Sequence, residues 1–356
     1  MPIKVLVVDD SALIRALLKD IIDGDSALSC VGCAPDAYVA RDMVKQLSPD
    51  VITLDIEMPR MDGLSFLEKL MAARPTPVVM ISSLTESGAE ATFRAIELGA
   101  VDFLAKPKLG IREGMEAYAE AIRDKIKAAS LARLRPRNLN ARAPHNGEKP
   151  LPPSRAPIVG TEKIIAIGAS TGGTEAIKDV LVDMPADSPG IVITQHMPPG
   201  FTRTFAERLN RLSRLHVVEA QGGERILPGH AFVAPGDYHL LVERSGANYI
   251  TRLSDGPHVH RHRPAVDPMF QSLAQCAGRN LIAALLTGMG KDGALGLKEI
   301  RNAGGHCIAQ DEATSVVYGM PKEAVAMDAA DEVLALAEIA DALIQQAHKR
   351  GSGNRV

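Results

Sequence analysis

The sequence has no tryptophan and only 3% aromatic residues, which argues against a surface on which nucleic-acid bases stack. Its formal net charge is −3, so neither nucleic acid nor an anionic lipid surface is indicated as a partner. No apolar run approaches the ~20 residues of a membrane span. The N-terminus leads directly into a predicted strand, which leaves no room for a signal peptide. We therefore expect a cytoplasmic protein with no direct membrane insertion.

Cysteine is also scarce, and the four present are typical of a protein from a reducing cytosol. Cys30 and Cys33 have the spacing of a redox or metal-binding pair. No second cysteine pair or nearby histidine accompanies them, and the surrounding LSCVGCA is typical of a strand. We interpret both as small buried side chains.

What the sequence does contain is enough apolar material for two domains, since 46% of its 356 residues are hydrophobic. Residues 1–129 alternate strand-like and helix-like segments, which indicates a parallel sheet covered on both faces. The predicted strands are 3–8, 29–34, 51–54, 77–81 and 102–104, and the predicted helices are 12–22, 36–47, 64–73, 88–98 and 113–129. Residues 130–160, rich in proline and arginine, predict a linker.

Charged and polar side chains gather where the first series of predicted strands end. They are Asp9, Asp10, Asp55, Ser82 and Lys106. The carboxyl ends of parallel strands form the ligand edge of such a sheet. Clustered carboxylates favour Mg²⁺, which brings phosphate oxygens with it, and a lysine and a hydroxyl suit a phosphoryl group. The alternative, that all five are merely solvated, is weak for residues from four different strand ends.

This half of the chain resembles the response-regulator receiver domain in the motifs VVDDS, LDIEMPRMDG, MISS and FLAKP. The resemblance implies a flavodoxin-like five-stranded fold and phosphorylation of Asp55 by a partner histidine kinase. The groups implied to hold Mg²⁺ are Asp10, Asp55 and the backbone carbonyl of Glu57, with Asp9 in support. By the same resemblance, Lys106 pairs with the phosphoryl group, and Ser82 and Phe103 form the switch pair.

A second α/β series is predicted over residues 161–350. Its predicted strands are 164–167, 191–194, 216–220, 230–234, 239–243, 249–253, 281–286 and 305–309, the last being the final one. Its predicted helices begin after residue 173 and continue at 202–211, 268–277, 294–303 and 332–348. We expect a doubly wound, mostly parallel sheet.

The decisive stretch is IIAIGASTGG at residues 164–173, where a buried strand turns into a helix with Ser170 at the bend. Such a bend aims a hydroxyl at a helix N-terminus, where free N–H groups stabilise an anion. Three interpretations compete for this stretch. The chain order of the candidate partners disfavours an α/β-hydrolase elbow, and Ser170 replaces the middle glycine of a dinucleotide loop. The third is a tight turn with a capping serine.

Partners downstream favour a nucleophile, because His196 and Asp292 also follow buried strands and so share one sheet edge with Ser170. A serine hydroxyl needs a neighbouring imidazole as base, and an acid fixes the tautomer of that imidazole. Backbone N–H groups near Met289 and Thr171 are candidates to bind an oxyanion. Asp267 and Asp311 are rival acids, with a helix N-cap and a polar loop as their respective alternatives.

The segment HVHRHRP carries three alternating histidines, His258, His260 and His262. A metal site is possible at this spacing, but arginine and proline crowd the segment. We interpret these histidines as polar groups that line a cleft.

The second half resembles the catalytic domain of chemotaxis protein-glutamate methylesterases in IGASTGG, QHMPPGFT, APGDYHL, HRHRPAVDPMFQS, LLTGMGKDGA and AQDEATSVVYGMPKEAV. The resemblance implies hydrolysis of glutamyl methyl esters and deamidation of glutamines on the cytoplasmic helices of chemoreceptors. It places the triad on Ser170, His196 and Asp292, an oxyanion donor on Met289 and a further active-site position on Thr171.

We therefore predict a phosphorylation-regulated serine hydrolase that needs Mg²⁺ in the first domain and no cofactor in the second. One alternative keeps the triad but acts on another protein ester or amide. A second alternative is a receiver with a binding output, such as a transcription factor. That would require a basic helix-turn-helix, which an α/β second half disfavours.

Overall fold

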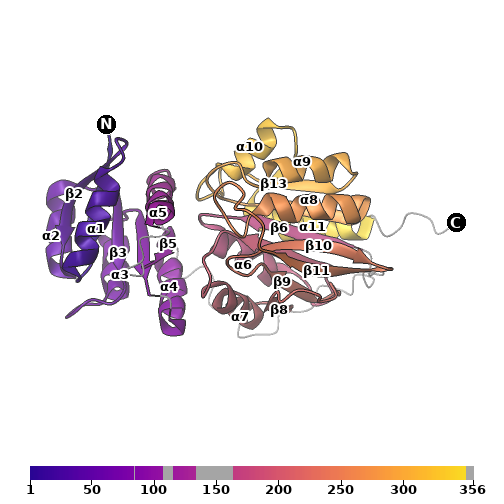
Figure 1. Cartoon of the computed structure of the whole chain (residues 1–356), viewed down its shortest axis with the longest axis horizontal. Coiled ribbons are helices and arrows are strands. Elements are labelled where there is room, and N and C mark those ends of the chain that lie inside the picture. The colour runs from indigo at the N-terminus through magenta and orange to yellow at the C-terminus, as the bar shows by residue number, and fades with distance from the viewer. Residues whose placement is uncertain (84, 107–114, 134–162, 350–356) are drawn as a thin grey trace.

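The computed structural model describes residues 1–83, 85–106, 115–133 and 163–349. They form two units that lie side by side, an N-terminal unit up to residue 133 and a C-terminal unit from residue 163 (Figure 1). Most of the predicted linker, residues 130–160, lies outside the described residues. No helix within the described part is both long and apolar enough to cross a bilayer.

The N-terminal unit is a parallel sheet in the order β2-β1-β3-β4-β5. Its strands are β1 (Ile3–Val8), β2 (Leu28–Ala34), β3 (Val51–Asp55), β4 (Val78–Ser82) and β5 (Asp102–Ala105). Its helices are α1 (Ala12–Asp23), α2 (Ala37–Leu47), α3 (Gly63–Ala73), α4 (Glu86–Leu98) and α5 (Met115–Ser130). Alternate residues of β1 pack on opposite faces, Val5 against α1 and α5 and Leu6 against α2, α3 and α4. The five predicted strands are confirmed.

The C-terminal unit has a seven-stranded parallel sheet in the order β14-β13-β12-β6-β7-β9-β8. Its strands are β6 (Ile164–Ala169), β7 (Gly190–Gln195), β8 (His216–Glu219), β9 (His230–Val233), β12 (Leu281–Leu285), β13 (His306–Gln310) and β14 (Glu332–Leu334). A separate antiparallel hairpin joins β10 (His239–Ser245) and β11 (Asn248–Ser254).

Helices cover both faces of this sheet. They are α6 (Gly173–Asp183), α7 (Thr202–Leu212), α8 (Val266–Cys276), α9 (Ala294–Asn302), α10 (Met320–Ala326) and α11 (Leu336–Lys349). Ile165 and Ile167 of β6 pack with α6, α7 and α11, whereas Ile164 and Ala166 pack with α8 and α9. Strands buried on both faces explain the continuous apolar runs in the sequence.

The C-terminal end of the chain corrects one prediction. The helix expected at 332–348 begins only at Leu336, because Glu332–Leu334 forms β14 and pairs with β13 at Ile308–Gln310. The strand at 305–309 is therefore not the last. Periodicity misses β14 because three residues are too few to show a strand pattern beside a long helix.

Cys30 and Cys33 lie on one face of the edge strand β2, only half-buried, with their Sγ atoms 3.7 Å apart. A bulge between them shifts the register with β1, so that Cys30 pairs with Val5 and Cys33 with Val7. The bulge brings both thiols to the same side of the strand. The predicted placement of these small side chains in a strand is confirmed, but the prediction that they are buried is wrong, since both are only half-buried.

Candidate active site

Ser170 lies in a tight turn between β6 and α6. Its backbone N–H donates to the carbonyl of Thr287 (3.0 Å), and its carbonyl accepts from the N–H of Gly173 (2.7 Å). Gly172 has a φ of +78°, a left-handed conformation that glycine adopts without strain. The helix begins without a side-chain cap, so the Ser170 hydroxyl is not used as the cap of α6.

The Ser170 hydroxyl instead faces an imidazole. His196, which follows β7, places Nδ1 3.1 Å from Ser170 Oγ and Nε2 2.7 Å from Asp292 Oδ2. All three residues are buried. With Asp292 ionised, Nε2 carries the proton that is donated to the carboxylate, which leaves Nδ1 free to accept from the serine hydroxyl. The structure thus brings the three predicted residues into one hydrogen-bonded line.

Asp292 is held as an anion by the start of α8. Its carboxylate accepts the backbone N–H groups of Val266 (2.6 Å, Oδ2) and Asp267 (3.0 Å, Oδ1). Burial raises the pKa of the Asp292 carboxyl, but the bonds from His196, Val266 and Asp267 outweigh burial and lower that pKa to about 2. A helix N-terminus favours a negative charge for the same reason. Asp292 therefore stays charged beside His196.

The rival acids lie elsewhere. The expected alternative role of Asp267, as the N-cap of α8, is wrong. Asp267 lies in the first turn of α8, and its carboxylate accepts from the Gly296 N–H (2.7 Å). Burial and the nearby charge of Asp292 raise its pKa. Asp311 accepts from the backbone and side chain of Thr314 in a turn. Among the described residues, neither carboxylate has a hydrogen bond or ion pair with His196.

The three histidines of HVHRHRP separate. His258 is exposed, His260 places Nε2 3.0 Å from Asp267 Oδ2, and His262 stacks on His196. Ligand atoms of His260, Asp267 and Asp292 lie within 4.8 Å of one another. Both Asp292 oxygens already accept hydrogen bonds, so we interpret the cluster as a hydrogen-bond network and not as a metal centre.

The loop at residues 287–290 lies against Ser170, where an oxyanion would form during attack. A Cβ on Gly288 would lie 2.7 Å from the Ser170 Cβ, so only glycine lets the 287–290 loop approach this closely. Within the described residues, the backbone N–H groups of Met289 and Thr171 have no hydrogen-bond acceptor. Free N–H groups next to a nucleophile can stabilise a tetrahedral oxyanion.

A second cluster lies in the N-terminal unit. Carboxylate oxygens of Asp9, Asp10 and Asp55 come within 4.8 Å of one another. Lys106 Nζ binds Asp55 Oδ2 at 2.6 Å and is 3.6 Å from Asp9 Oδ2, a buried oxygen without a hydrogen-bond partner. Burial raises the pKa of Asp9, and it raises that of Asp55 to about 6 despite the bond from Lys106. A divalent cation bound by oxygen ligands fits this unbalanced charge.

The remaining predicted residues of this unit lie around that cluster. Glu57 donates its backbone N–H to Asp55 Oδ1 (3.2 Å), and the role of its carbonyl stays a prediction. Ser82 is buried at the end of β4 and donates to the Gly88 carbonyl (3.1 Å). Phe103 is buried as well and contacts Phe93 and Phe201. Phe201 belongs to the other unit.

The two units meet at the active site. Thr171, next to Ser170, donates its hydroxyl to Asp102 Oδ2 of β5 (2.7 Å), while Lys125 holds Asp102 Oδ1 (2.7 Å). Phe103 lies 4.7 Å from Phe201 between ring centroids. Sequence analysis missed Asp102 because nothing in its local pattern reveals a contact 69 residues away.

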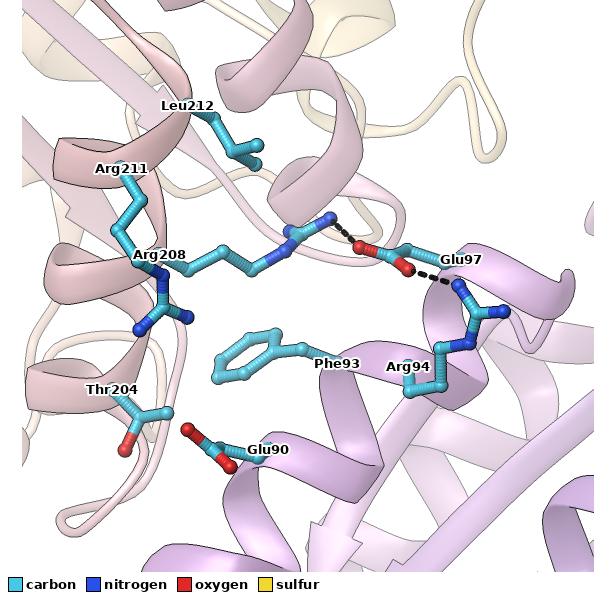
Figure 2. Close-up of a pocket in the computed structure, with 8 residues that line it drawn as sticks. All are labelled: Glu90, Phe93, Arg94, Glu97, Thr204, Arg208, Arg211 and Leu212. Atoms are coloured by element: carbon cyan, nitrogen blue, oxygen red, sulfur yellow. Dashed lines mark hydrogen bonds and ion pairs between the residues drawn. The ribbon is translucent and has the colours of Figure 1, made fainter. Parts of the chain in front are cut away.

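A salt bridge continues this contact between α4 and α7. Arg208 reaches across from α7 to Glu97 on α4 (2.9 Å), and Glu97 also binds Arg94 (Figure 2). Arg208 holds Glu175 of its own unit as well, at 2.8 Å. The residues of Figure 2 line a pocket of about 310 Å³ between the units. The largest hydrophobic cluster runs through the same contact.

Comparison with known proteins agrees with this geometry. Residues 165–343 match the family model described as CheB methylesterase, and residues 5–117 match that of the response regulator receiver domain. A protein-glutamate methylesterase/protein-glutamine glutaminase of Pseudomonas aeruginosa is 69% identical over 100% of both chains. The chain belongs to this family. A Chromohalobacter salexigens protein of the same name is 58% identical over 99% of both chains.

A solved relative covers the C-terminal unit. The crystal structure of the Thermotoga maritima CheB methylesterase catalytic domain is 40% identical and covers 51% of this chain and 97% of that chain, with a TM-score of 0.51. The predicted family, fold class and enzyme class are thereby confirmed, and so is the interpretation as a chemotaxis methylesterase with a receiver. The roles of individual residues stay predictions.

Proposed function

We propose that this methylesterase demethylates glutamyl methyl esters, and deamidates glutamines, on chemoreceptor cytoplasmic helices with Ser170 as nucleophile. The hydrogen-bonded line Ser170–His196–Asp292 is the observation that carries the proposal. We assign residues 161–350 to the catalytic domain, residues 1–129 to the regulatory domain and residues 130–160 to the linker. The chemistry needs no cofactor in the catalytic domain.

The first half-reaction joins the substrate to Ser170. His196 Nδ1 takes the hydroxyl proton as Oγ attacks the ester carbonyl, and Asp292 stabilises the imidazolium through the Nε2–H bond. The resulting oxyanion binds the backbone N–H groups of Met289 and Thr171. His196 then gives its proton to the leaving methoxide of an ester, or to the leaving amide nitrogen of a glutamine, which releases methanol or ammonia.

The second half-reaction restores the enzyme. Water attacks the glutamyl–Ser170 ester, and His196 Nδ1 takes one of its protons. Collapse of the tetrahedral intermediate returns that proton to Ser170 Oγ and frees the glutamic acid, whose remaining proton is lost to solvent to give the carboxylate. The same line of residues thus serves both steps.

The N-terminal unit supplies the regulation. We propose that a chemotaxis histidine kinase phosphorylates Asp55, with Mg²⁺ held by Asp9, Asp10, Asp55 and the Glu57 carbonyl. When bound, the cation neutralises the phosphoryl oxygens and the carboxylates together. Lys106, already 2.6 Å from Asp55, pairs with the added group, and Ser82 and Phe103 respond as the switch pair.

Docking of the unphosphorylated N-terminal unit inhibits the enzyme in this proposal. The Asp102 carboxylate accepts a hydrogen bond from the hydroxyl of Thr171 beside the nucleophile, and Phe103 packs on Phe201. A shift of Phe103 on phosphorylation therefore weakens a contact at the cleft itself. The docked population falls because the modified surface binds less well.

Methanol release tests the proposed function. Receptor-containing membranes carrying radiolabelled methyl esters are incubated with the full chain and a small phosphodonor, and volatile label is counted. Ser170→Ala should lower the rate by several powers of ten, because the residue forms the covalent intermediate. Circular dichroism confirms that the variant is folded. A folded variant that keeps more than about a tenth of the rate contradicts the nucleophile, and no release by the wild type points to another ester or amide as substrate.

A further inference from the structure

The face of the catalytic imidazole is covered by a second histidine. The rings of His196 and His262 stack with centroids 3.8 Å apart and planes inclined by only 18°. The two hydrogen bonds of His196 lie along its ring edge, to Ser170 and Asp292. Those bonds fix the ring within its plane but leave it free to tilt. The stack supplies the missing restraint.

The segment that delivers His262 is built with unusual backbone. Val259 and His262 exchange both backbone hydrogen bonds (3.0 and 2.9 Å) across a two-residue turn. The turn residues His260 and Arg261 have φ values of +49° and +67°. Asparagine and glycine are the usual residues at such positions, and side chains like these are strained there. Strain of this kind is kept where the surrounding structure needs the geometry.

The ends of the same segment are clamped. Buried His239 donates Nε2–H to the Pro257 carbonyl (2.9 Å) and accepts the Ala265 N–H at Nδ1 (3.2 Å). Arg263 binds the carbonyl oxygens of Asp255 and Gly256 (2.6 and 3.0 Å). A loop anchored at both ends holds its tip, and with it His262, in one place.

We propose that His262 is a positioning residue for the hydrolysis, whose stacked ring holds His196 in the plane shared by Ser170 and Asp292. This rests on the proposed role of His196 as the base. A neutral stacked ring also faces its π electrons toward the imidazolium that forms during catalysis, and such a contact favours the cation.

Burial, together with the charges around it, keeps His262 neutral. Burial and the charges of His196, Lys125 and Arg261 lower its pKa to about 2, against the opposing charge of Asp292. Lys125 comes from α5 of the N-terminal unit. A charged His262 would repel the imidazolium of His196, so neutrality is required for the proposed role.

Three substitutions in the full chain test this role, with the phosphodonor present and rates expressed per site titrated with a serine-reactive phosphonate. His262→Ala should lower kcat by about tenfold to a hundredfold, the cost of a misplaced catalytic group, with KM nearly unchanged. His262→Phe keeps a flat ring for stacking and should restore most of kcat. His258→Ala, in the same segment but exposed, is the matched control and should match the wild type.

A spectroscopic signature separates positioning from stability. The proton between His196 Nε2 and Asp292 should give a sharp low-field NMR line in the wild type and in His262→Phe, and a broadened line in His262→Ala. A kcat for His262→Ala within about twofold of the wild type overturns the proposal. So does a His262→Phe variant as slow as His262→Ala. Activity of Ser170→Ala, in contrast, would refute the nucleophile and leave the stacking result to be read separately.

Discussion

Two carboxylate sites lie at the carboxyl ends of parallel strands, one in each unit, and their electrostatics are opposite. Asp55 is buried among other carboxylates, and its pKa is raised to about 6. Asp292 is equally buried, but three donors lower its pKa to about 2. The first site has more negative charge than its lysine balances, and the second is complete without any added group.

The difference follows from what each site does in the proposed function. A site that must accept Mg²⁺ and a phosphoryl group gains stability when they arrive, so an unbalanced resting state makes it responsive. A site that turns over substrate repeatedly benefits from groups held in place beforehand. In the proposed function, regulation and catalysis thus use the equivalent edge of two separate sheets with opposite charge balance.

The largest effect on activity is expected from a substitution in the catalytic site, at Asp292. Asp292→Asn cannot hold His196 with its proton on Nε2 and should lower kcat by about 10⁴-fold, the loss seen when the wrong imidazole tautomer is favoured. Methanol release from methylated receptors measures it.

Matched controls use the rival acids. Asp267→Asn and Asp311→Asn should be milder, since neither side chain has a hydrogen bond to His196 in the described structure. If either proved more damaging than Asp292→Asn with the fold preserved, Asp292 would not be the triad acid.

The acceptor site can be broken in the same way. Acetyl phosphate with Mg²⁺ should label the wild type in an acid-stable, base-labile form, and Asp55→Asn should lose the label. Chelation with EDTA should prevent labelling of the wild type. Label that persists in Asp55→Asn would identify a different acceptor, such as Asp9 or Asp10.

A comparison of the full chain with a catalytic fragment tests whether the N-terminal unit inhibits the catalytic site. A fragment beginning near residue 158 should hydrolyse receptor esters about tenfold faster than the unphosphorylated full chain. A factor of this size corresponds to a typical coupling free energy between two sites. The fragment is expected to fold because a homologous catalytic domain crystallised alone. Phosphodonor should activate the full chain only, and equal resting rates for both proteins would rule out inhibition by docking.

The smallest expected effect is on stability, and its sign differs between the sites. The raised pKa of Asp55 means that the folded state binds its proton more tightly, so the contribution of Asp55 to stability falls as pH rises from about 4 to 6. Asp55→Asn should therefore melt several degrees higher than the wild type at neutral pH without Mg²⁺. The gap should narrow at pH 4 or on addition of Mg²⁺.

Asp292 predicts the reverse. Its lowered pKa contributes stability that is present above pH 4 and lost as pH falls toward 2. Asp292→Asn should melt lower than the wild type at neutral pH, as calorimetry of the full chain would show. The same sign for both substitutions would contradict the contrast between the sites.

Strand ends made much of this architecture predictable. Ser170, His196 and Asp292 each follow an apolar run, and parallel strands bring such positions to one edge whatever their separation in sequence. The five polar residues of the N-terminal unit were found by the same argument. The start of α1 is also readable locally, since Ser11 is a residue type that favours the N-cap and its hydroxyl accepts from the Ile14 N–H.

Contacts between segments were out of reach of the same reasoning. Asp267 looked like a cap for α8, yet Asp292 from a distant loop binds those N–H groups. The stacking of His262 depends on a turn whose residues carry no turn signature. The histidine spacing of HVHRHRP marked the segment as unusual without showing which ring would meet His196.

The chain leaves α5 where it already contacts the other unit, since Arg133 binds Glu312 (2.5 Å) and donates its backbone N–H to the Val316 carbonyl (3.1 Å). A released N-terminal unit therefore stays tethered near the cleft that it covered, at an effective concentration in the ~mM range. Re-docking needs no diffusional search, so inhibition returns as soon as the phosphoryl group is lost. Under the proposed regulation, the lifetime of the acyl phosphate on Asp55 would set the duration of each burst of demethylation, and the enzyme would act as a timer.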